Sequence, residues 1–178
     1  MIRLFAAIEI PENVRLRLSL LQGGVPGARW TPVENLHLTL RFIGEVDEPT
    51  ASDIDSVLSE LSLPAFALTL KGVGQFGGKE GRALWAGAAS NAALQRLAAK
   101  IESALQRMGR PAETRKYAPH VTLARLKDAP LQKIHEFLAA HNLFDSAPFT
   151  VGAFALFSSH QTPRGSLYRP ERIYPLDG

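Results

Sequence analysis

The sequence predicts an α+β fold in which helices flank mainly antiparallel sheets. Apolar residues follow a strand period in some segments and a helix period in others along all 178 residues. Some strand segments are joined through a helix and others through a short turn, so crossovers are mixed with hairpins. That mixture disfavours a doubly wound parallel sheet. No low-complexity tract or long linker divides the chain, so we expect residues 1–178 to form one domain.

The first part of the chain predicts two strands around a helix. Residues 3–10 are rich in apolar and aromatic side chains, which is typical of a buried strand. Pro11 stands where a helix begins, and this helix should stop at Gly23. A short extended piece at 30–32 and a turn then lead to a strand at 37–43.

A helix and a hairpin follow. Residues 49–61 place apolar side chains at helical spacing, and Pro64 ends the helix. Residues 66–73 and 82–88 read as the two strands of a hairpin. The glycines over 72–77 match G-x-G-x-x-G, but a dinucleotide-binding loop requires a helix directly after it. We therefore interpret these glycines as the hairpin tip.

The longest predicted helix begins at Asn91, a good N-cap, and ends at Met108 before Gly109. Its apolar residues form one continuous face. The remaining elements are a strand at 120–126, a helix at 130–141, and two strands at 149–157 and 167–176 joined by a polar loop that contains His160.

Composition limits the function classes. The 20 Lys and Arg against 17 Asp and Glu give a formal charge of +3, which favours an anionic partner only mildly. The absence of cysteine excludes disulfides, thiolate zinc sites and a cysteine nucleophile. No apolar stretch approaches the roughly 18 residues of a membrane span, and the N-terminus does not resemble a signal peptide. We therefore expect a cytoplasmic protein with no membrane partner.

The most informative feature is a His-x-Thr-Leu pattern that occurs twice, at His37 and at His120, in a chain with five histidines. In a strand, residues i and i+2 point to the same face, so Thr39 and Thr122 stand beside their histidines. Two such pairs facing each other supply two imidazoles and two hydroxyls, which can open a phosphodiester without a metal. A lone histidine or a strand threonine is more often structural. The repetition favours catalytic histidines and threonines that donate to phosphate oxygens.

Three more residues near the motifs are candidate substrate ligands. Arg41 continues the face of Thr39, where it could reach a phosphate or merely cap an exposed strand end. Strict alternation puts Arg125 on the face opposite His120, so it contacts substrate only if the strand twists or bulges. Tyr117 is the first candidate among the aromatic residues for stacking on a base.

Residues 30–46, with the string LHLTLRFIGEV, and residues 117–125, YAPHVTLAR, resemble the RNA 2′,3′-cyclic phosphodiesterases. These enzymes are also called 2′-5′ RNA ligases and belong to the 2H phosphoesterase superfamily. The resemblance covers nearly the whole chain, and neither motif departs from the family pattern. It implies a bilobal fold with pseudo-twofold symmetry around a central cleft, one motif per lobe, and no metal or nucleotide cofactor.

The resemblance implies hydrolysis of a terminal 2′,3′-cyclic phosphate, on RNA ends or nucleotides, to a 2′-phosphomonoester. In such a site His37 gives a proton to the leaving oxygen and His120 is the base for water, although the sequence itself does not order the two. The reverse reaction gives a 2′-5′ link. A monomer is expected.

Two alternatives to a cofactor-free enzyme stay open. The chain could be a non-catalytic protein that binds RNA ends or nucleotides, and turnover of a cyclic-phosphate dinucleotide distinguishes the two. The histidines could also be metal ligands. Against a metal, neither motif has a second histidine or a carboxylate at ligand spacing.

Overall fold

The computed structural model describes residues 1–77 and 82–177 and is an α+β fold. Its strands are β1 (Ile2–Glu9), β2 (Ala28–Trp30), β3 (His37–Val46), β4 (Phe66–Leu68), β5 (Leu70–Phe76), β6 (Arg82–Ala88), β7 (His120–Leu126), β8 (Phe149–Val151), β9 (Ala153–Thr162) and β10 (Gly165–Pro175). Its helices are α1 (Glu12–Ser19), α2 (Glu48–Ser59), α3 (Ala92–Arg107) and α4 (Leu131–His141), with a short 3-10 helix, η1, at Val33–Asn35. The named strands pair antiparallel, so the predicted class is confirmed.

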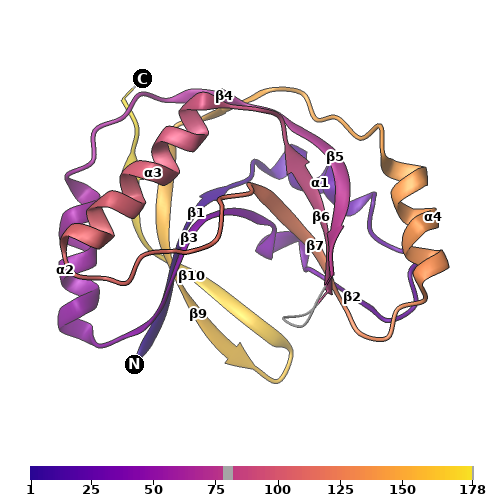
Figure 1. The fold of residues 1–178 in the computed structure, drawn as a ribbon, viewed down its shortest axis with the longest axis horizontal. Coiled ribbons are helices and arrows are strands. Elements are labelled where there is room, and N and C mark those ends of the chain that lie inside the picture. The colour runs from indigo at the N-terminus through magenta and orange to yellow at the C-terminus, as the bar shows by residue number, and fades with distance from the viewer. Residues whose placement is uncertain (78–81, 178) are drawn as a thin grey trace.

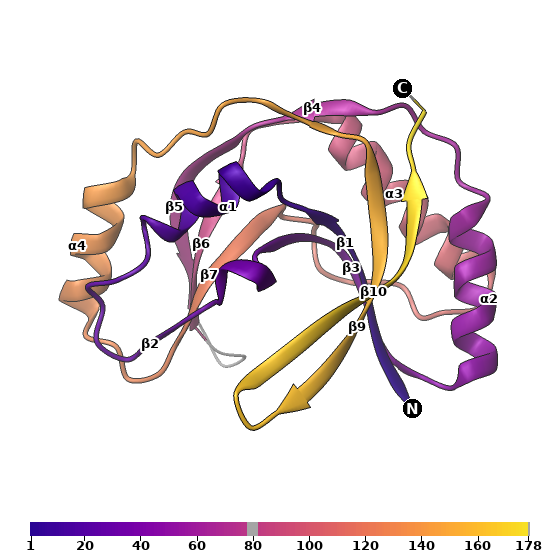
Figure 2. The ribbon, with the colours of Figure 1, turned by 180° about the vertical axis from the view of Figure 1, so that it is seen from behind.

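The sheet consists of two halves that meet at one residue pair. The strand path runs β10-β9-β1-β3-β7-β6-β5, and β2 also pairs with β7. Between β3 and β7, the pair is Leu38 with Val121. The two halves splay apart into two lobes, with α2 and α3 on one lobe and α4 beside β5 on the other (Figures 1 and 2). The mainly antiparallel sheets predicted for the two lobes are therefore joined into one sheet through β3 and β7.

Two segments that pass between the lobes pair with each other. β4 and β8 form a separate two-stranded sheet that lies across the top of the molecule in Figure 1. Because each segment leaves this small sheet before it joins the large one, the single strands predicted at 66–73 and 149–157 are each two strands. The breaks fall at Thr69 and at Gly152, and only the glycine is a local signal of a break in a strand.

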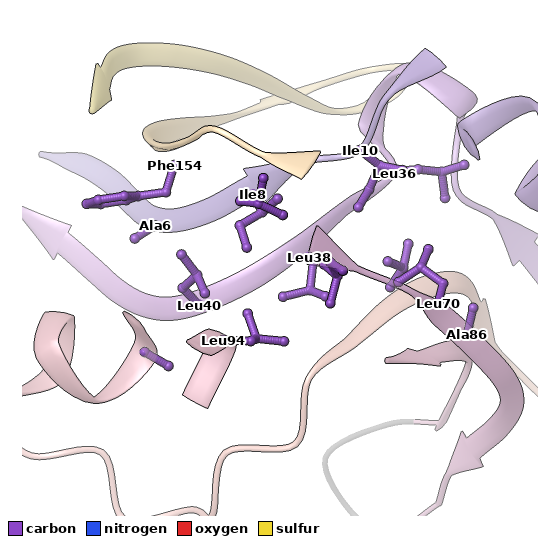
Figure 3. Packing of buried hydrophobic residues seen from close by; sticks show 14 of the residues in the cluster. Ala6, Ile8, Ile10, Leu36, Leu38, Leu40, Leu70, Ala86, Leu94 and Phe154 are labelled. Atoms are coloured by element: carbon purple, nitrogen blue, oxygen red, sulfur yellow. The ribbon is translucent and has the colours of Figure 1, made fainter. Parts of the chain in front are cut away.

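The apolar residues of both motifs lie in the core, as predicted. Leu38 and Val121 are fully buried, and Leu40 is nearly so. Figure 3 shows Leu38 and Leu40 between Ile8 of β1 and Leu94 of α3. Since side chains alternate along a strand, this burial leaves the histidine and threonine of each motif on the other face.

The helix α3 confirms the longest predicted helix almost residue for residue. The Asn91 side chain accepts a hydrogen bond from the Leu94 amide at 3.0 Å and so caps the first turn. Gly109 has φ +98°, a left-handed conformation that commonly ends helices. The buried face consists of Leu94, Leu97, Ala98, Ile101, Ala104 and Leu105.

The strand β3 contains a β-bulge at the last residue of its motif. Thr39 pairs with Ala7 on β1, but the next pair joins Arg41 to Ala6, so Leu40 is an extra residue. A bulge puts two successive side chains on one face of the sheet. Arg41 therefore lies on the core face with Leu40 and not on the face of Thr39.

The strand β7 contains the same bulge at the same place in its motif. Thr122 pairs with Trp85 on β6, but the next pair joins Ala124 to Leu84, so Leu123 is the extra residue. The residue after Ala124 consequently returns to the face of Thr122. The repetition of the bulge extends the pseudo-symmetry of the two lobes beyond the four-residue motif.

Two predicted loops are strands. Gly72 and Gly74, which were assigned to a hairpin tip, lie within β5, Gly77 follows the last residue of that strand, and residues 78–81 lie outside the described residues. The polar loop that contains His160 is the end of β9, which stays paired with β10 as far as Thr162 and Gly165. Among the helices that the structure describes, none is long and apolar enough to cross a membrane.

Candidate active site

The central pair between β3 and β7 aligns the two motifs. Because the strands are antiparallel, extending the register by one residue on each side places His37 opposite Thr122 and Thr39 opposite His120. All four side chains are on the cleft face and are partly exposed. Each histidine therefore stands beside its own threonine and across from the threonine of the other lobe.

Each histidine is held by the backbone carbonyl two residues before it. His37 Nδ1 donates to the Asn35 carbonyl at 2.7 Å, and His120 Nδ1 donates to the Ala118 carbonyl at 2.7 Å. A carbonyl oxygen only accepts, so Nδ1 carries the proton in both rings. Nε2 is left as the atom that exchanges a proton, and His37 Nε2 lies 3.0 Å from Thr39 Oγ1. The two sites have the same tautomer and the same reactive atom.

The pKa values of both histidines are lowered. Burial lowers the pKa of His37, the Asn35 carbonyl opposes this, and the charge of His120 lowers it further. Burial lowers the pKa of His120 as well, and Arg125 adds to the effect against the Ala118 carbonyl. A proton on His120 disfavours a second proton on His37, so the pair holds one proton more readily than two. A singly protonated pair contains one acid and one base.

Aromatic rings surround His37. The Phe5 ring centroid lies 5.0 Å from the imidazole, and Tyr168 meets it edge-on at 5.2 Å. Phe5 also stacks on Phe157 at 5.3 Å. These rings form an apolar cluster on the cleft face that is distinct from the main core. The sequence predicted a buried strand over residues 3–10, and the structure shows that Phe5 and Ala7 of this strand are buried in the second cluster.

A glycine explains how Trp85 lies beside His120. A Cβ atom on Gly74 would lie 2.2 Å from Trp85 Cζ2, so the indole packs directly on the glycine backbone. The indole centroid is 6.3 Å from the His120 ring, and Phe76 meets that ring edge-on at 4.8 Å. Gly74 therefore serves close packing, whereas a Cβ at Gly72 or Gly77 would meet nothing within 4 Å.

The expectation that Arg41 shares the face of His37 is wrong. The bulge in β3 turns Arg41 to the helix side, where its guanidinium forms an ion pair with Glu102 of α3 and donates to the Pro111 carbonyl at 2.6 Å. Its side chain is only 10% exposed. Arg41 joins the strand to α3 and is not available to substrate.

The bulge has the opposite effect on Arg125. It returns Arg125 to the face of His120 and Thr122, where the side chain is exposed. This is the condition under which we expect Arg125 to contact substrate, and contact itself stays a prediction. The corresponding position in the first motif is Phe42, which is 56% exposed.

Tyr117 connects the two motifs. Its hydroxyl donates to the Thr39 carbonyl at 3.0 Å, and its ring packs against the main core. Burial raises the pKa of Tyr117 well above its ordinary value, so the hydroxyl keeps its proton. These contacts make Tyr117 a positioning residue for β3, while stacking on a base stays a prediction.

Two charged residues near the site were missed from the sequence. Glu9 is the register partner of His37 on β1, and Arg29 is the register partner of Arg125 on β2. Glu9 continues the alternation of residues 3–10, and this alternation was a signal that Glu9 faces the site. The sequence contains no such signal for Arg29, because its position depends on which strand pairs with β7.

The described part of the chain contains no group of three or more His, Cys, Asp or Glu side chains that could hold a metal ion. Thr122 makes no side-chain hydrogen bond to the described residues, so its hydroxyl is free to donate to a ligand. The site thus offers two proton-exchanging nitrogens, hydroxyl donors and a cation on one face. This set suits acid–base chemistry at a phosphate.

Two lobes that each place one His-x-Thr-Leu motif on the same face of the sheet, aligned through the pair of Leu38 with Val121, define a 2H phosphoesterase. The chain belongs to the 2′-5′ RNA ligase superfamily, whose sequence model matches residues 14–163.

Similar proteins span almost the same length. A Thermotoga maritima protein named RNA 2′,3′-cyclic phosphodiesterase is 34% identical over an alignment of 177 residues that covers 94% of this chain and 91% of the relative. An Aeropyrum pernix protein of the same name is 35% identical over an alignment of 158 residues that covers 87% of this chain and 89% of the relative. The crystal structure of E. coli LigT in its apo form matches with a TM-score of 0.82 at 26% identity, covering 99% of this chain and 98% of LigT.

Proposed function

We propose that this protein is an RNA 2′,3′-cyclic phosphodiesterase that hydrolyses a terminal 2′,3′-cyclic phosphate to a 2′-phosphomonoester. The observation that carries the proposal is the matched pair of histidines, each with Nδ1 fixed by a carbonyl at 2.7 Å, which leaves Nε2 as the atom that exchanges a proton. The names of the Thermotoga and Aeropyrum relatives support the same activity.

The reaction requires one proton acceptor and one proton donor on opposite sides of phosphorus. His120 Nε2 takes a proton from water as the water oxygen bonds to phosphorus. The bond from phosphorus to the 3′-oxygen breaks, and His37 Nε2–H gives its proton to that oxygen. The products are a 2′-phosphomonoester and a 3′-hydroxyl, and the histidines have exchanged protonation states. This assignment of donor and base rests on the family resemblance.

The threonines act on the charge that develops during the reaction. Thr39 and Thr122 donate hydroxyl hydrogen bonds to the non-bridging phosphate oxygens, which gain negative charge in the transition state. Arg125 adds a positive charge on the same face. Run in reverse with a 5′-hydroxyl in place of water, the same site would join RNA ends through a 2′-5′ link.

Nucleotides and RNA ends are the ligand class that fits this site. E. coli LigT has been crystallised with 3′-AMP, with ATP, with NADP+ and with phosphate, so that relative holds nucleotides and phosphate. The 3′-AMP complex matches this chain with a TM-score of 0.81. We propose further that residues 1–178 act as one bilobal domain, because each lobe contributes one motif to a single site. We also propose that the protein is a cytoplasmic monomer.

Product identity tests the proposal. Phosphorus NMR of a 2′,3′-cyclic nucleotide treated with the protein should show the 2′-phosphomonoester alone, at a rate unchanged by EDTA. A linear 3′-phosphate should be inert. A predominantly 3′-phosphate product would mean that the leaving oxygen is assigned wrongly. The absence of turnover would favour the alternative, a non-catalytic protein that binds RNA ends or nucleotides.

A further inference from the structure

A buried serine lies behind the apolar cluster of the cleft face. Phe157 of β9 belongs to that cluster, so the next residue, Ser158, points to the opposite face of the sheet, where it is fully buried. The Ser158 hydroxyl donates to a carboxylate oxygen of Glu171 on β10, and His160 Nε2 donates to the same hydroxyl oxygen at 2.9 Å. A carboxylate only accepts and a hydroxyl has one proton, so the direction of both bonds is fixed.

Glu171 is the extra residue of a β-bulge in β10. Pro170 pairs with Phe157, but the next pair joins Arg172 to Leu156, so Glu171 has no register partner on β9. A bulge shifts the alternation of side chains by one residue. The bond to the buried serine holds this extra residue on the face of the sheet away from the cleft.

Two tyrosines of β10 depend on the bulge. Tyr168 and Tyr174 are six residues apart, and in a regular strand this even spacing would put both on one face. Tyr168 instead packs with the cluster on the cleft face. Tyr174 is buried in the main core, and its hydroxyl donates to Asp55 of α2 at 2.7 Å. The extra residue, Glu171, is what lets both rings reach their places.

Tyr168 is in turn part of the surroundings of His37. Its ring meets the imidazole edge-on at 5.2 Å and meets Phe5 edge-on at 5.1 Å. The far end of the β9–β10 hairpin is tied to the segment before β3, because the Asn35 side chain donates to the Ser166 carbonyl at 3.0 Å. The same Asn35 accepts from His37 through its own carbonyl. The ring that covers the imidazole on this side is therefore placed by β10.

We propose that Glu171 is a positioning residue for His37, on which it acts through the bulge in β10 and the ring of Tyr168. Glu171 acts from behind the sheet, since its carboxylate bonds to a serine on the face away from the cleft. The inference rests on the proposed function, in which His37 Nε2 exchanges a proton.

The place of Glu171 determines the sign of the expected effect. Burial is the main cause of the lowered pKa of His37. When the Tyr168 ring leaves its place, water reaches the imidazole and the pKa rises toward its ordinary value. The loss of the negative charge of Glu171 acts in the other direction, because a nearby anion raises the pKa of a histidine. A rise in the pKa of His37 therefore reports position and not charge.

Other titratable and charged groups surround the two residues. Beside His37 they are Glu9 of β1, Arg15 of α1, Glu34 of η1, His120 of β7 and Tyr168 of β10. On the other face, near Glu171, they are His160 of β9, Arg169 and Arg172 of β10, and Asp55 of α2. Glu171→Ala leaves every one of these groups in the chain, so a change at His37 does not come from the loss of another charge.

The test measures the pKa of His37 by NMR of its imidazole C2 proton in the full chain without substrate, with His37→Gln to identify the resonance. Glu171→Ala and Ser158→Ala should each raise this pKa. Glu171→Gln should keep the wild-type value, because an amide oxygen still accepts from the serine hydroxyl. Arg172→Ala is the matched control and should also keep it, since it removes an exposed ion pair with Asp55 from the next residue of β10 but not the bond to Ser158.

Activity on a 2′,3′-cyclic nucleotide gives a second readout. Glu171→Ala should lower kcat by about two- to tenfold, the range expected for one lost edge-on aromatic contact. The maximum of its kcat/KM profile should move to higher pH. Tyr168→Ala should have the same effects, and the double variant should be no worse than either single variant, because both remove the same contact. Tyr168→Phe keeps the ring and should keep the wild-type profile.

The outcomes separate the inference from the function beneath it. An unchanged or lowered pKa of His37 in folded Glu171→Ala overturns the positioning role, and so does an equal rise in Arg172→Ala. If Glu171→Ala does not fold, Ser158→Ala decides in its place, because it removes the same bond. If the wild-type protein hydrolyses no cyclic phosphate, the proposed function is wrong, and the NMR measurement still decides whether Glu171 positions His37.

Discussion

Leu38 and Val121 form the backbone pair that joins β3 to β7, and they lie at the centre of the pseudo-symmetric site. Both side chains are fully buried, so the junction between the lobes is anchored in the core. This one pair sets the arrangement of His37, Thr39, His120 and Thr122, because each of the four is a direct chain neighbour of Leu38 or Val121. A change of register at this pair would separate all four groups at once.

The two histidines are held alike but have different neighbours. On β1 the register partner of His37 is Glu9, whereas on β6 the partner of His120 is Gly87. The ring of His37 lies among Phe5 and Tyr168, while that of His120 is influenced by a nearby cation. Symmetric backbone geometry thus combines with unequal surroundings, as a site with one acid and one base requires.

Replacing either histidine by alanine should lower kcat/KM on a 2′,3′-cyclic nucleotide by about 10² to 10⁴, the usual contribution of a proton-transfer group. The double variant should be little worse than either single variant, because the two groups act as a unit. Circular dichroism should be unchanged. Near wild-type turnover by His37→Ala or His120→Ala would exclude the two-histidine mechanism.

Replacing each threonine should lower kcat, but only one replacement should also change the pH–rate profile. Thr39→Val and Thr122→Val both delete a donor to the phosphate oxygens, so each should lower kcat by about tenfold or more. Only Thr39→Val also removes the contact with His37 Nε2 at 3.0 Å, so it alone should move one limb of the pH–rate profile. If both variants keep full activity, the threonines are only strand formers.

The pH dependence of kcat/KM should be bell-shaped, with its maximum below pH 6.5. One histidine must be deprotonated and the other protonated, and both pKa values in the free protein are lowered from 6.5. The rising limb and the falling limb therefore both lie on the acid side, and each belongs to the pair. A bound anionic substrate raises both pKa values, so the kcat profile should shift to higher pH. A falling limb of kcat/KM above neutrality would contradict the lowered values.

The sequence predicts most elements of this fold because their signals are local. The strand at 120–126 and the helix that begins after Asn91 depend on periodicity and capping within one segment. The bulges could not be predicted in this way. They depend on how Thr39 and Thr122 pair with neighbouring strands, and a single extra residue reverses the face of the residues that directly follow it.

The two arginines show the consequence for the site. Strict alternation placed Arg41 in the cleft and Arg125 outside it, and the repeated bulge reverses both placements. One local signal was present in the second motif, where the apolar residues Leu123 and Ala124 are consecutive. Strict alternation would expose one of them to solvent, whereas the structure buries both. Arg41 follows Leu40 without such a sign.

Arg41→Met should lower the free energy of unfolding by about 1–3 kcal/mol, since it removes hydrogen bonds to a carboxylate. It should leave kcat/KM within about twofold, because the side chain faces α3 and not the cleft. The matched control is Arg3→Met, which removes an exposed ion pair with Glu45 and should cost less than about 1 kcal/mol. A large loss of activity without loss of stability would place Arg41 back in the substrate site.

The contribution of Arg41 should depend on acid pH. Burial alone would raise the pKa of Glu102, but hydrogen bonds from Arg41, Gln106 and the Glu113 amide lower it from 4.5 to about 2. A lowered carboxyl pKa stabilises the folded state above the unfolded value and loses that effect as pH falls through the folded value. The difference in stability between wild type and Arg41→Met should therefore be full above about pH 4.5 and shrink toward pH 2. Urea unfolding across this range measures it.

Gly74→Ala should damage both stability and activity, because the new Cβ would lie 2.2 Å from Trp85 Cζ2 and the indole must move. Overpacking of this kind costs about 1–3 kcal/mol. Since Trp85 packs beside His120, a displaced indole changes the surroundings of that ring, so kcat/KM should fall together with a change in tryptophan fluorescence. Gly152→Ala is the control, because a Cβ there meets nothing within 4 Å. If Gly74→Ala matches this control in stability, fluorescence and rate, then the indole does not rest on the glycine and the account of the second aromatic wall is wrong. A fall in rate with unchanged fluorescence would instead show that β5 itself, and not Trp85, transmits the change to His120.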